Sequence, residues 1–135
     1  MSFHVCVWID HRTAKLFQIS AHEAAVTEVE DQRPPHHIHR STDHLGLGTV
    51  PLDRQMMAEV GEQLRDAEAI LLAGPGQAKF ELRNYLQLSE PAVAARIWGI
   101  EPSDHPTDPQ LVAWARDWFR AQDRMHETRT SKTSR

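Results

Sequence analysis

The chain has 135 residues, of which 40% are hydrophobic and 25% are charged, and this length and composition predict one globular domain with a single core. Its formal net charge of -4 argues against a protein that coats nucleic acid without specificity, because such affinity depends on cations that release counterions from phosphates. The single cysteine, Cys6, excludes a disulfide framework and a thiolate zinc cluster, and with no apolar run long enough to span a bilayer it indicates a cytoplasmic protein without membrane contact.

Three strands are expected at the start of the chain. Residues 3–10 (FHVCVWID) alternate with apolar side chains on both faces, which is typical of a central strand. Residues 13–20 follow after a short interruption, so these two strands predict an antiparallel hairpin. Residues 24–30 alternate less clearly and predict an edge strand that completes a meander.

Residues 32–52 show no sustained period of either kind, and loops of this length are usually functional or disordered. Asp53 can then cap a helix, residues 69–73 (AILLA) have the pattern of a buried parallel strand, and a second helix follows Gly74-Pro75-Gly76. Residues 95–101 predict a fifth strand, and a capping box starts the last helix. The expected buried stripes of the three helices are Met56, Met57, Val60 and Leu64; Ala78, Leu82, Tyr85 and Leu86; and Leu111, Ala115, Trp118 and Phe119.

This order of elements predicts an α/β fold with a five-stranded mixed sheet and helices on both faces. With right-handed crossovers, the arrangement that places residues 3–10 beside residues 69–73 in the middle of the sheet is the ribonuclease H-like one. We expect residues 1–122 to form the single domain. Residues 123–135 are polar and basic and lack apolar periodicity, which predicts a flexible tail.

Three polar segments are expected to meet where parallel strands end: Asp10-His11-Arg12, Gly74-Pro75-Gly76 and Ser103-Asp104-His105. The glycines would let the backbone approach a ligand, the N–H groups at the start of the next helix attract an anion, and Lys79 would add positive charge. The alternative is that Gly-Pro-Gly only turns the chain from strand to helix and that Lys79 is solvated.

Aspartate and histidine are adjacent in three places, at residues 10–11, 43–44 and 104–105. Carboxylates and imidazoles can bind zinc or a related ion, so Asp10, His11, Asp104 and His105 are candidate ligands of a divalent metal. Hairpin and capping roles explain the aspartates without a metal. An alternative function is a metal-dependent phosphoester hydrolase of the ribonuclease H-like fold, although the strand at 69–73 ends in Gly74 and not in an acid.

Four segments carry a resemblance to a known family: VWIDHRTAKLFQI, HHIHRSTDHLGLG, ILLAGPGQAKFELRNYL and GIEPSDHPTDPQLVAWARDWF. They resemble a small bacterial family labelled translational machinery protein, whose members are similar to the middle domain of archaeal and eukaryotic peptide-chain release factors and of Pelota. The resemblance covers nearly the whole chain except the tail. Its link to release factors depends mainly on topology and on the GPG-x-x-K turn, here Gly74 to Lys79.

The resemblance implies a role in translation but not peptide release. In release factors the long loop carries a Gly-Gly-Gln motif that enters the peptidyl transferase centre, whereas the corresponding residues here, 46–49 (GLGT), lack the glutamine. We therefore expect a non-catalytic domain that binds RNA or the ribosome, as in Pelota, with ribosomal RNA or tRNA as its partner. A further alternative is an interaction module that forms a homodimer through the exposed edge of the meander. The expected RNA-binding and anion-binding residues are Arg12, His37, His39, Arg40, Gly74, Pro75, Gly76 and Lys79.

Overall fold

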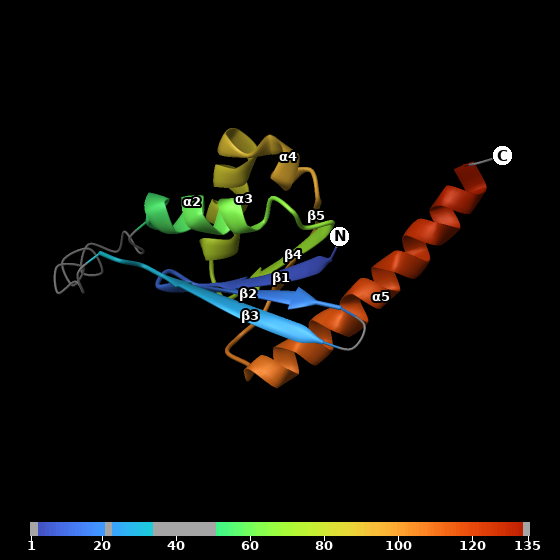
Figure 1. The fold of residues 1–135 in the computed structure, drawn as a ribbon, viewed down its shortest axis with the longest axis horizontal. Helices are drawn as coiled ribbons and strands as arrows, with labels where there is room; N and C mark the ends of the chain where they lie inside the picture. Colours follow the sequence, from blue (N-terminus) through green and yellow to red (C-terminus); the bar gives the residue numbers. More distant parts are fainter. Residues whose placement is uncertain (1–2, 21–22, 34–50, 134–135) are drawn as a thin grey trace.

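The computed structural model describes residues 3–20, 23–33 and 51–133, with side chains as far as residue 125. The described residues form one sheet in the strand order β3-β2-β1-β4-β5 (Figure 1). β1 is antiparallel to β2 and parallel to β4, β2 is antiparallel to β3, and β4 is parallel to β5. This order confirms the predicted ribonuclease H-like mixed sheet. The strands are β1 (His4–Ile9), β2 (Thr13–Ile19), β3 (Ala24–Glu30), β4 (Ala69–Gly74) and β5 (Ile97–Pro102).

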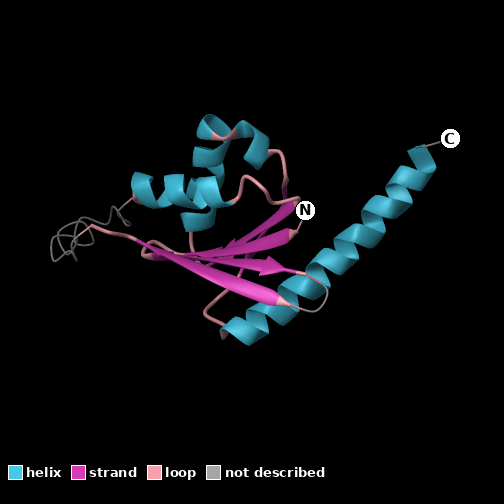
Figure 2. Ribbon diagram, viewed as in Figure 1, coloured by secondary structure: helices cyan, strands magenta, loops and turns pink. Residues whose placement is uncertain are grey.

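Helices cover both faces of the sheet (Figure 2). On one face lie α2 (Arg54–Gln63), α3 (Ala78–Ser89) and the short α4 (Pro91–Ala94), and on the other lies α5 (Asp108–Thr133). Side chains that alternate along β1 divide between the two layers, as the sequence pattern predicts. The first core contains Val5, Val7, Ile9, Ile70 and Leu72 with Met56, Val60, Leu82 and Leu86, and the second contains Cys6, Trp8, Phe17 and Leu71 with Leu111, Ala115 and Phe119.

Cys6 is fully buried in the second core, and this burial raises the pKa of its thiol from 9.0 to about 12. The thiol is therefore inert under ordinary conditions, in agreement with the position of Cys6 inside an apolar strand. No part of the chain that the structure describes contains a helix with both the length and the apolarity of a membrane span.

β3 forms one edge of the sheet, as predicted, and the side chain of Val26 on it is 51% exposed. A homodimer formed through this edge stays a prediction.

α5 continues to Thr133 and extends past the sheet, so the predicted boundary between residues 122 and 123 falls inside this helix (Figure 1).

Candidate functional site: the rim of the sheet

The carboxyl ends of β1, β4 and β5 lie along one edge of the sheet because these strands are parallel. We define the rim by the residues that follow them: 10–12, 74–79 and 103–105. The backbone N–H of Ser103 donates to the carbonyl oxygen of Gly74 at 3.2 Å, and Trp8 Nε1 donates to the carbonyl oxygen of Asp104 at 2.9 Å. The predicted meeting of three polar segments at one edge is confirmed.

The two glycines of the Gly74-Pro75-Gly76 turn have different structural roles. Gly74 has φ +140°, and a Cβ atom at this position would lie 2.2 Å from the carbonyl oxygen of Ile9. Gly76 has φ +63°, but a Cβ atom there would meet no atom within 4 Å. Gly74 is therefore required by the close approach of β1 and β4, whereas Gly76 is favoured by its backbone conformation alone.

Lys79 secures the Gly-Pro-Gly turn from inside the protein. Its Nζ donates to the carbonyl oxygens of Gly74 at 2.9 Å and Gly76 at 2.6 Å, and the residue is only 4% exposed. Removal from water lowers the pKa of the ammonium group below its usual value. The alternative that Lys79 is solvated is therefore wrong, because its ammonium group is buried and donates hydrogen bonds to two carbonyl oxygens. Its direct contact with a phosphate stays a prediction.

Asp10 organises the turn between β1 and β2. Its Oδ1 atom accepts from the backbone N–H groups of Arg12 and Thr13, both at 2.8 Å, and its own N–H donates to the carbonyl oxygen of Thr13 at 3.0 Å. The other carboxylate oxygen of Asp10 lies 3.8 Å from Nε2 of His105, whose Nδ1 is 3.2 Å from the carboxylate of Asp104. The side chains of Asp10 and His105 thus bring the β1–β2 turn close to the residues that follow β5.

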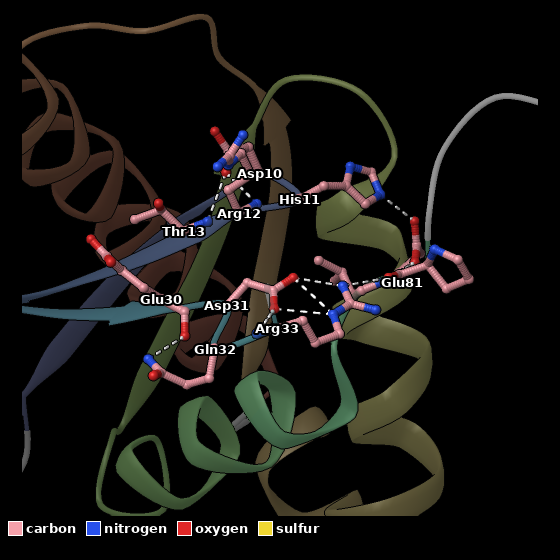
Figure 3. A network of polar contacts seen from close by, with 11 residues as sticks. Asp10, His11, Arg12, Thr13, Glu30, Asp31, Gln32, Arg33 and Glu81 are labelled. Atoms are coloured by element: carbon pink, nitrogen blue, oxygen red, sulfur yellow. Dashed lines mark hydrogen bonds and ion pairs between the residues drawn. The ribbon is translucent and has the colours of Figure 1, made fainter. Parts of the chain in front are cut away.

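His11 points to the opposite side of the rim, toward α3 (Figure 3). Its Nε2 lies 2.7 Å from Oε2 of Glu81, and Oε1 of the same carboxylate accepts from the backbone N–H of Leu52 at 3.0 Å. The carboxylate of Glu81 therefore joins three segments of the chain. Sequence reasoning missed Glu81, since its only local signal is an acidic residue in the first turn of a helix.

The candidate metal ligands do not converge on one point. His11 contacts Glu81, whereas Asp10, Asp104 and His105 lie on the other side of the β1–β2 turn. Within residues 3–20, 23–33 and 51–125, no group of three or more histidine, cysteine, aspartate or glutamate side chains is arranged to hold a metal ion. The divalent metal stays a prediction.

The remaining candidate RNA-binding residues divide between exposed and undescribed parts of the chain. Arg12 is exposed on the β1–β2 turn, and Gly76 is exposed at the Gly-Pro-Gly turn. His37, His39 and Arg40 lie outside the described residues. RNA or anion binding by these residues stays a prediction.

Comparison with known proteins shows that the fold is shared with translation factors. No protein-family model matches the chain, and no curated protein matches its sequence. Among solved structures, Pelota of Archaeoglobus fulgidus has 17% identity and a TM-score of 0.57, covering 93% of this chain and 38% of that protein. The archaeal translation termination factor aRF1 has 17% identity and a TM-score of 0.53, covering 93% and 39%.

A third solved structure, Dom34 of S. cerevisiae, has 9% identity and a TM-score of 0.50, covering 75% of this chain and 28% of that protein. The chain thus spans less than half the length of each of these proteins. At such low identities the likeness shows the fold alone. The similarity of this chain to a domain of Pelota and of release factors, which the sequence resemblance implied, is confirmed at that level.

Proposed function

We propose that this chain is a non-catalytic, cytoplasmic domain that acts in translation by binding RNA or the ribosome. The observation that carries the proposal is the match to Pelota and to aRF1 over 93% of the chain. aRF1 is a translation termination factor, and Dom34 is a translation termination-like factor involved in RNA quality control. The absence of a Gly-Gly-Gln motif from the sequence supports a binding role over peptide release.

The rim supplies chemistry that suits a phosphate backbone. No side chain caps the first turn of α3, where the N–H groups of Phe80 and Glu81 donate to the carbonyl oxygen of Gln77. In this proposal the N–H groups of Ala78 and Lys79, which follow the exposed Gly76 and Gln77, receive an anion. Arg12 is exposed on the neighbouring turn and would add a cation. In this proposal Lys79 holds the turn in shape and adds positive charge from beneath, while His37, His39 and Arg40 complete the contact.

Co-sedimentation of the purified chain with bacterial ribosomes over a salt series tests the proposal. We expect binding that weakens as salt rises, since contacts to phosphates release counterions. Arg12→Ala should weaken binding and reduce the slope of log affinity against log salt by about 1. Arg65→Ala is the matched control, because Arg65 is also an exposed arginine but lies far from the rim. It precedes β4, at the opposite end of the sheet, and pairs with Glu90.

The absence of co-sedimentation even at low salt would remove the ribosome from this proposal. Hydrolysis of RNA by the purified chain with added manganese would contradict a non-catalytic role and favour the phosphoester hydrolase. Elemental analysis of the same preparation then reports whether a metal accompanies that activity.

A further inference from the structure

The chain leaves and re-enters the described structure at the rim. β3 ends at Glu30, which pairs with Thr13 at the start of β2, so the exit lies beside the β1–β2 turn. The chain returns at residue 51, and the side chain of Leu52 is 4% exposed in the core beneath α2 and α3. We call residues 31–33 and 51–52 the stem of the segment 34–50.

Arg33 ties the two sides of the stem together. Its guanidinium contacts both carboxylate oxygens of Asp31, with Nη2 at 2.6 Å from Oδ2 and Nε at 3.0 Å from Oδ1. The same Nη2 donates to the carbonyl oxygen of Pro51 at 3.0 Å. The paired, planar contact with Asp31 fixes the orientation of the guanidinium. Residues 31–33, where the chain leaves, are therefore held beside Pro51, where it returns.

Glu81 ties the stem to the body of the protein (Figure 3). One carboxylate oxygen accepts from the N–H of Leu52 and the other from Nε2 of His11, while the N–H of Asp31 donates to the carbonyl oxygen of Arg12 at 2.9 Å. The return side of the stem is therefore bound to α3, and the exit side to the β1–β2 turn. Both oxygens of Glu81 are used within the protein.

We propose that Glu81 is a positioning residue that holds the stem against α3 and the β1–β2 turn. Glu81 follows Lys79 by two residues on the helix that begins at the Gly-Pro-Gly turn. The first turn of α3 therefore makes both contacts: Lys79 holds the Gly-Pro-Gly turn, and Glu81 holds Leu52, where the chain returns. The consequence for RNA contact depends on the proposed function, whereas the anchoring of the stem does not.

Hydrogen exchange at the amide of Leu52 measures the anchor directly. Glu81→Ala should accelerate this exchange about 10- to 100-fold, since a hydrogen bond to a charged acceptor is lost. Amides in the centre of β4 should keep their rates, which separates local release from global unfolding. Glu81→Gln keeps one oxygen that can accept from Leu52, so its rate should fall between those of the wild type and Glu81→Ala.

Glu90→Ala is the matched control, because it removes a carboxylate at the other end of α3 that lies 2.6 Å from Arg65. Leu52 should then exchange as in the wild type. Unchanged Leu52 exchange in Glu81→Ala would overturn the anchor. Failure of the wild type to sediment with ribosomes would refute the proposed function and leave the exchange result intact. If the wild type binds, equal binding by Glu81→Ala would overturn the positioning role in RNA contact.

Discussion

Replacement of Gly74 by alanine tests the close approach of the two central strands. The added Cβ would lie 2.2 Å from the carbonyl oxygen of Ile9 and 3.1 Å from its carbonyl carbon, so a backbone and not a flexible side chain would have to move. β1 and β4 are both buried between two helical layers, which leaves little room for this movement. Gly76→Ala is the matched control, since it has a positive φ but open space around the new atom.

The expected loss of stability differs between the two variants. An alanine in the left-handed conformation costs about 1–2 kcal/mol, of which the stiffer unfolded chain offsets roughly 0.4–1 kcal/mol, so Gly76→Ala should lose about 1 kcal/mol. Gly74→Ala adds overpacking against the Ile9 backbone and disturbs the carbonyl that accepts from Lys79 and Ser103. Its total should reach about 3–5 kcal/mol, at the upper end for single substitutions.

Urea denaturation followed by tryptophan fluorescence measures both values, since the chain has four tryptophans. The two unfolding curves should be compared at equal slope, so that the midpoints report stability alone. Midpoints that differ by the equivalent of less than about 1 kcal/mol would refute the argument that Gly74 is required by packing and not only by its φ.

Three further predictions concern groups in the core or packed against it. Lys79→Met removes the ammonium donor from two turn carbonyls, of which that of Gly74 keeps the N–H of Ser103, and should cost about 1–3 kcal/mol in urea denaturation; equal or greater stability would show that the ammonium is dispensable. The pKa of Cys6 is higher in the folded state, so its contribution to stability is full below about pH 9 and lost as the pH rises toward 12. One pH unit above 9 the loss is about 1 kcal/mol, and Cys6→Ala should lack this decline between pH 8 and 10. Gly99→Ala would bring a Cβ 2.4 Å from Cζ2 of Trp118, so it should shift the tryptophan emission and cost about 1–3 kcal/mol; an unchanged spectrum and midpoint would contradict this packing.

Several features of the rim could be predicted because they follow from the chain direction of buried strands. The apolar residues on both faces of residues 3–10 and 69–73 indicate two central strands, and parallel neighbours bring their polar ends together. Gly74-Pro75-Gly76 is a visible turn signal in the sequence. The full length of α5 was not predictable, since residues 123–133 lack the apolar stripe that marks a packed helix.

The amino-acid sequence by itself determined where the strands lie along the chain and which of their faces are buried, because side-chain alternation is a local property of each segment. Only the tertiary structure decided which polar groups are partners. From the sequence we expect the cation of Lys79 at the surface, yet its side chain is buried beneath the turn. Glu81 meets His11 across 70 positions of the chain and Leu52 across 29. Such contacts depend on where separate backbones come together, and no local period encodes that position.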